Sequence, residues 1–96
     1  MTLDEFKATL GDARLPEVVP VLRALWYAAN GRWDEAHTIA QDINDRSGAW
    51  VQAYLHRVEG DQGNARYWYR RAAQSEATDR LEAEWGRIAT ALLAQS

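Results

Sequence analysis

Apolar side chains in this sequence recur at helical spacing between regularly placed glycines. Leu81, Trp85, Ile88 and Leu92 fall at positions i, i+4, i+7 and i+11, so they share one helix face. No stretch alternates apolar and polar residues for long, as a half-buried strand would. The pattern therefore predicts an all-α fold in which glycines mark the ends of helices.

The sequence predicts about six antiparallel helices joined by short turns. The expected ranges are about 3–10, 16 or 17–30, 33–43, 49–59, 64–74 and 80–92. Thr2 with Glu5 has the pattern of a capping box at the first helix. Ser47 is the expected cap of the fourth helix, and Asp79 with Glu82 is the expected capping pair of the sixth.

Composition sets the limits on function. The 96 residues suit a single domain, residues 1–96, and carry a net charge of −3 with no basic stripe that would bind nucleic acid. Without cysteine, the chain forms no disulfide and no thiolate metal site. No apolar run approaches the length of a membrane span, and the first ten residues carry acids where a secretion signal needs positive charge. We therefore expect a cytoplasmic protein that binds neither nucleic acid nor a membrane.

An internal repeat aligns residues 30–36 with residues 59–65. Gly31 matches Gly60 and Ala36 matches Ala65, each at an offset of 29 residues. In both copies a helix ends at glycine and the next helix begins with a small residue, which lets two helices approach closely.

These segments resemble tetratricopeptide and Sel1-like helical repeats. The phrase GRWDEA at 31–36 is similar to the tetratricopeptide turn, and NARYWYRRAA at 64–73 is similar to a Sel1-like second helix. The resemblance covers roughly residues 22–73, although Pro20 and Arg23 stand where the family prefers large apolar residues. It implies two helical hairpins, covered by the first and last helices, that form a scaffold for a bound peptide. The segment 48–72 also resembles short bacterial proteins without an assigned role.

A stripe on the fourth predicted helix is the first candidate binding site. Trp50, Tyr54 and Arg57 lie at i, i+4 and i+7, and His56 and Glu59 flank them. On the concave face of a repeat, flat rings beside a guanidinium would anchor a protein or peptide. The alternative is that Trp50 and Tyr54 are core residues covered by the terminal helices.

A metal or small-ligand site is the second candidate. His56 and Glu59 are three residues apart on one helix face, and His37 lies on the preceding helix. With Asp61 they offer imidazole and carboxylate ligands that suit zinc or iron. The alternative is a half-buried histidine that bonds to a carbonyl or a carboxylate.

Other chemistry finds little support in the sequence. Helix capping explains Ser47 and Ser75, Ser96 is the last residue, and Gly60 with Gly63 lacks the pattern of a phosphate-binding loop. No cofactor is predicted, and an enzyme is less expected than a binding protein. Arg66, Arg70 and Arg71 form a basic surface that would suit an acidic partner or would simply be solvated. A homodimer closed through exposed helix faces is a third possibility.

Overall fold

The computed structural model describes residues 1–12 and 14–95, and in this part of the chain it contains six α-helices and no strand. The helices are α1 (Leu3–Ala8), α2 (Pro20–Ala29), α3 (Trp33–Gln41), α4 (Arg46–Val58), α5 (Gln62–Ala72) and α6 (Leu81–Gln95). The predicted all-α fold is confirmed. Within the same residues, no helix combines the length and the apolar character that crossing a membrane requires.

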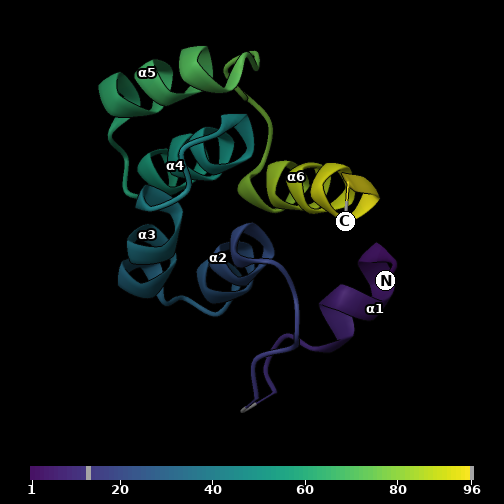
Figure 1. Cartoon of the computed structure of the whole chain (residues 1–96). Coiled ribbons are helices and arrows are strands. Elements are labelled where there is room, and N and C mark those ends of the chain that lie inside the picture. The colour runs from purple at the N-terminus through teal and green to yellow at the C-terminus, as the bar shows by residue number, and fades with distance from the viewer. Residues whose placement is uncertain (13, 96) are drawn as a thin grey trace.

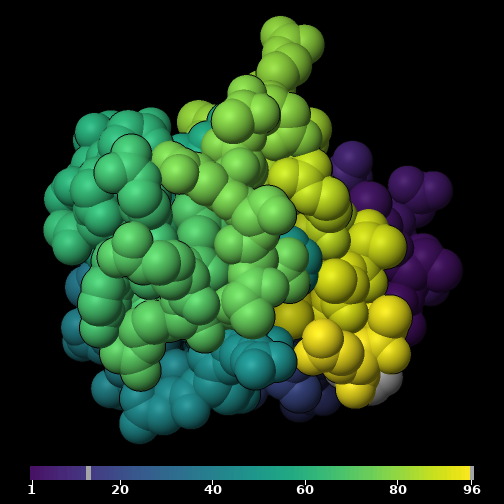
Figure 2. Space-filling model, turned by 90° about the horizontal axis from the view of Figure 1, so that it is seen from above, coloured from purple at the N-terminus to yellow at the C-terminus, as the bar shows by residue number. Residues whose placement is uncertain are grey.

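Two helical hairpins, α2–α3 and α4–α5, form the centre of the molecule (Figure 1). The packing of α3 on α4 joins the hairpins, and α6 lies against both α2 and α4. Helix α1 contacts α6, and Figure 2 shows the α6 surface between the linker that precedes it and α1. Helix α6 therefore covers both hairpins, whereas α1 packs on α6.

The turns within the two hairpins have the same backbone geometry. Gly31 and Gly60 have φ angles of 73° and 85°, which glycine adopts without a steric penalty. In each turn the residue after the glycine donates its backbone N–H to a carbonyl five positions earlier, at 2.9 Å. Ala36 and Ala65 are both fully buried where the helices approach each other. The offset seen in the sequence thus corresponds to a repeated structural unit.

The main core lies between α2, α4 and α6 and is closed by α1. Its buried side chains include Leu22, Leu25, Leu55 and Ile88. The ring of Phe6 in α1 stacks on Trp85 in α6, with centroids 5.7 Å apart and planes 4° apart. The indole N–H of Trp85 donates to the carbonyl of Leu25 at 2.8 Å, so this large ring is buried without an unsatisfied donor.

The start of the first helix is confirmed and that of the second is corrected. The Thr2 side chain and the Glu5 side chain form the predicted capping box. The second helix begins at Pro20 rather than near residue 16 or 17. A residue before proline is pushed out of the helical region, and Val19 is accordingly extended, with φ −60° and ψ 155°.

Two predicted helix caps are also corrected. The fourth helix begins three residues earlier than expected, and Asp45 caps it in place of Ser47, because the Asp45 carboxylate accepts a backbone N–H of the first turn at 2.9 Å. Asp79 lies two residues before the first residue of α6, and its carboxylate binds Arg87 instead, at 2.6 Å. Short polar side chains cluster at both sites, so the sequence alone left the choice of cap ambiguous.

Candidate functional site

The predicted binding stripe on α4 faces α6 and the segment before it. Tyr54 is 6% exposed and belongs to the main core. Trp50 is half-buried and packs against both hydrophobic clusters of the protein. Helix α6 therefore occupies the place where the predicted groove would open, and the structure matches the alternative in which these rings are covered by a terminal helix.

Arg57, the third member of the stripe, is paired inside the protein. Its guanidinium donates to Glu84 Oε1 at 2.8 Å and to the backbone carbonyl of Asp79. The Glu84 side chain is fully buried, and its second oxygen accepts the hydroxyl of Tyr69. Removing one partner of such a buried pair costs about 3–5 kcal/mol. Arg57 thus holds α6 against the second hairpin rather than facing a ligand.

The two tyrosines beside this network are held in the neutral form. Burial, followed by the nearby Glu84 charge, raises the pKa of Tyr54 to about 12. Burial also raises the pKa of Tyr69, and its hydrogen bond to Glu84 adds to the effect. Neither phenol therefore ionises near neutral pH, and Tyr69 acts as a hydrogen-bond donor.

Two pockets border the predicted stripe, one of about 430 Å³ that Tyr54 lines with Leu81 and Trp85, and one beside Trp50. The pocket beside Trp50 has a volume of about 380 Å³ and is lined by Trp50, residues 74–79, Glu84 and Arg87. Arg87 and Asp79 form an ion pair across its wall. Side chains that bond to one another leave few groups free for a ligand, so this pocket is a weak candidate.

The histidine cluster lies where α4 ends and α5 begins. His56 is in the last turn of α4, Glu59 is the residue that caps α4, and Asp61 is the residue that caps α5. One ligand atom from each residue lies within 4.8 Å of the other two. His56 Nδ1 is 2.6 Å from Glu59 Oε1. The structure therefore brings together three of the four residues named for a metal site.

His37 lies beside this cluster but is not part of it. Its ring stacks on Trp33, with centroids 4.8 Å apart, and meets the His56 ring edge to face at 5.8 Å. The Trp33 indole N–H donates to the carbonyl of Leu55 at 2.8 Å and so fixes the stack against α4. His37 and Trp33 thus form one wall beside the His56 imidazole.

A third site, which the sequence reasoning missed, surrounds Gln52 of α4. A pocket of about 250 Å³ opens between the α3–α4 turn and α5, and its lining includes Gln52, Arg46, Trp68 and Arg71. Gln52 is 2% exposed, and its Oε1 atom has no hydrogen-bond partner among the residues that the structure describes. Buried side-chain oxygens are nearly always paired, so Gln52 is an unusual residue at the wall of this pocket.

A signal for Gln52 was present in the sequence. Gln52 lies three residues after Ala49 and one before Ala53, and all three are buried on the side of α4 that meets α3 and α5. A polar residue within an apolar face is the pattern to notice. Nothing in the sequence, however, shows whether such a side chain has a partner, because that depends on residues of other helices.

The basic surface of α5 borders this pocket. The Arg71 guanidinium lies 5.2 Å from the Trp68 ring centroid and donates to the Tyr67 hydroxyl at 3.1 Å. Arg66 pairs with Glu76 at 3.4 Å, and Arg70 is exposed. The Arg71 guanidinium thus lies near both rings and pairs with no carboxylate among the described residues, so it can still meet an anion.

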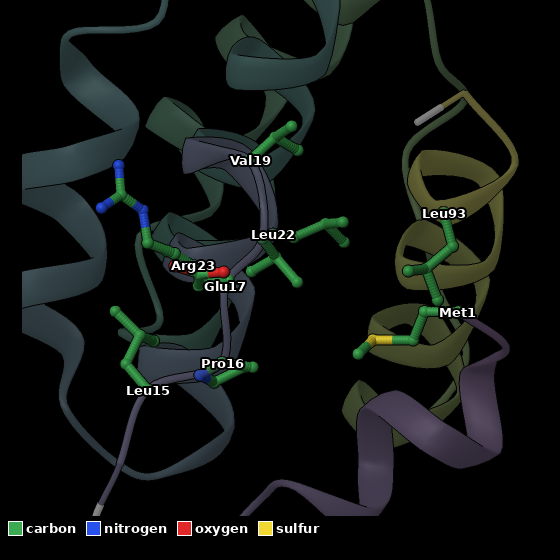
Figure 3. A pocket seen from close by; sticks show the side chains of 9 residues that line it. Met1, Leu15, Pro16, Glu17, Val19, Leu22, Arg23 and Leu93 are labelled. Carbon is green, nitrogen blue, oxygen red and sulfur yellow. The ribbon is translucent and has the colours of Figure 1, made fainter.

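A larger pocket, of about 700 Å³, lies between residues 15–19, α2 and the end of α6 (Figure 3). Met1, Leu22 and Leu93 supply apolar lining. Figure 3 shows the Arg23 side chain extending away from Met1 and Leu93. Two charged residues, Glu17 and Arg23, also line this pocket, and Arg23 Nε is buried without a hydrogen-bond partner among the described residues.

Comparisons with family models, curated proteins and solved structures find no match to this chain. The geometry described above therefore carries the functional argument on its own.

Proposed function

We propose that this protein is a small interaction module, of the tetratricopeptide or Sel1-like kind, that binds an acidic peptide segment of a partner protein. The site is the pocket between the α3–α4 turn and α5, in place of the covered stripe on α4. The observation that carries the proposal is the lining of this pocket, which combines the buried polar residue Gln52 with Arg46, Arg71 and the ring of Trp68. The setting we propose is the cytoplasm of a bacterium.

The pocket favours a peptide because of the groups it combines. Gln52 contributes a carboxamide to the lining, a group that can form hydrogen bonds with the backbone of a peptide. Arg71 and Arg46 at the lining offer positive charge to a carboxylate, and the Trp68 ring offers an apolar surface. The volume of about 250 Å³ lies just below the usual range for small-molecule sites, so it suits a side chain or a turn of peptide better than a whole cofactor.

The charge pattern of α5 favours an acidic partner. Arg66, Arg70 and Arg71 follow one another along this helix, and Arg70 has no ion-pair partner among the described residues. Charge complementarity of this kind raises the association rate and excludes basic partners.

Fluorescence titration tests the proposal with two sets of short synthetic peptides. One set is rich in aspartate and glutamate, and the other carries asparagine and glutamine at the same places. We expect the acidic set to bind and to change the emission of Trp68, which lines the pocket. Arg71→Gln should weaken binding at least about tenfold, since hydrogen bonds to charged groups contribute about 1.5–3 kcal/mol.

Arg14→Gln is the matched control, because Arg14 is exposed and lies outside the pocket lining. Equal binding of the two peptide sets, or equal losses in both variants, would contradict the proposal. Sedimentation of the free protein measures whether it is a monomer or a dimer and so distinguishes the interaction module from the homodimer hypothesis. A stable dimer that binds no peptide would favour an interface between two copies.

A further inference from the structure

We propose that His56, Glu59 and Asp61 form a binding site for a divalent transition-metal ion at the corner between α4 and α5. This site lies apart from the peptide pocket and would operate whether or not that pocket binds a peptide. The ligands are one ring nitrogen of His56 and one carboxylate oxygen from each acid.

The spacing of the ligand atoms fits one ion. They lie within 4.8 Å of one another, and two of them are 2.6 Å apart. Ligands held about 2.1 Å from a tetrahedral zinc ion are roughly 3.4 Å from each other. The Glu59 side chain is 39% exposed, so rotation of its carboxylate can adjust these distances without moving the backbone.

The fold places the three ligands by local means. The left-handed Gly60 reverses the chain directly after Glu59 and brings Asp61 back beside the last turn of α4. The Asn64 side chain donates to Asp61 Oδ2 at 2.7 Å and orients that carboxylate, as residues that bond to metal ligands do. The rings of Trp33 and His37 bound the imidazole, with centroids 6.2 Å and 5.8 Å from it.

The charge of the cluster favours a cation. Among the residues that the structure describes, neither Glu59 nor Asp61 pairs with a lysine or an arginine. Two carboxylates without a basic partner from lysine or arginine in the described part of the chain give the cluster a net negative charge, which attracts a cation.

The donor set indicates the class of metal. An imidazole nitrogen favours zinc, iron or copper, whereas magnesium and calcium prefer oxygen ligands throughout. Three protein ligands leave a further position that water can occupy. We therefore assign the site to an ion of the Zn²⁺ type and not to Mg²⁺ or Ca²⁺.

Calorimetry of the purified full chain tests the proposal, with Zn²⁺ as the probe, Mg²⁺ as the comparison ion and Co²⁺ for its visible absorption. We expect one Zn²⁺ ion per chain and no heat from Mg²⁺. The variants His56→Ala, Glu59→Gln and Asp61→Asn should each weaken Zn²⁺ binding at least about tenfold. Losing a residue that only supports a metal ligand already lowers metal affinity by about that factor. Glu59→Gln and Asp61→Asn keep the shape of the exposed side chains, and asparagine still caps α5.

His37→Ala is the matched control, because it removes the neighbouring histidine and leaves all three ligands. Its Zn²⁺ affinity should stay close to that of the parent protein. The proposal is overturned if the parent chain binds no Zn²⁺, if Glu59→Gln and Asp61→Asn bind as the parent does, or if His37→Ala loses binding as His56→Ala does. The same variants should bind acidic peptides as the parent protein does, so a failure of the metal site can be told apart from a failure of the peptide pocket.

Discussion

Replacing Gln52 with methionine should make this protein more stable. Gln52 is 2% exposed and its Oε1 atom is unpaired, and leaving a buried acceptor without a donor costs about 1–3 kcal/mol. Methionine is unbranched and of similar length, and it adapts to irregular spaces in a core. Gln52→Met therefore removes the penalty without creating a cavity. We expect a gain in unfolding free energy of about 1 kcal/mol, at the low end of the range, because the carboxamide borders a pocket.

Urea unfolding followed by far-ultraviolet circular dichroism measures this change. In a domain of this size, 1 kcal/mol raises the melting temperature by roughly 4–8 °C. The dependence of the unfolding free energy on urea should not change, since the two proteins expose similar surface. Gln62→Met is the control, because Gln62 is exposed on α5, and its effect should stay within about 0.5 kcal/mol.

A loss of more than about 1 kcal/mol in Gln52→Met would refute the reasoning, because it would mean that the carboxamide is satisfied in the folded protein. If the reasoning holds, the same variant should be more stable and yet bind acidic peptides more weakly. Higher stability together with weaker binding is expected where a protein keeps a destabilising group for its function.

Two further predictions follow from the packing and from the tyrosines. Gly48→Ala should destabilise the protein by about 1–3 kcal/mol, because a Cβ atom there would lie 2.3 Å from the backbone oxygen of Ile43. Gly63→Ala, whose Cβ atom would have its nearest neighbour at 3.9 Å, should instead stabilise the protein by about 0.5 kcal/mol. Thermal unfolding of both variants checks this, and similar melting temperatures would contradict it. Since the pKa of Tyr54 is raised in the folded state to about 12, the unfolded chain releases this proton first, and stability should fall as the pH rises from about 10 to about 12. Urea midpoints at about pH 8 and about pH 11 should show a smaller fall in Tyr54→Phe than in Tyr67→Phe, whose ring is exposed, and equal falls would exclude burial as the cause.

Much of the fold could be predicted because it is encoded locally. The capping box of Thr2 and Glu5 and the turns at Gly31 and Gly60 depend on residues within a few positions of one another. The first residues of helices were harder to predict, since Pro16 and Pro20 both suit a first turn and only Pro20 begins a helix. The boundaries were therefore less accurate than the number and type of elements.

The candidate sites depended on contacts that the sequence does not contain. His56, Glu59 and Asp61 were recognised because they lie within six residues of one another. The burial of Tyr54 and the pairing of Arg57 depend on α6, whose Glu84 follows Arg57 by 27 residues. Helical periodicity identifies the buried face of each helix but not the helix that covers it.

The stacking of Phe6 on Trp85 also affects how the chain is made. The rings come from α1 and α6, and the Trp85 indole bonds to a carbonyl of α2, 60 positions earlier in the chain. Each hairpin can form from contacts between neighbouring helices, which is fast. During synthesis, however, the apolar faces of α2 and α4 stay open to water until α6 has left the ribosome. A chain stalled before that point would present these faces to chaperones and proteases.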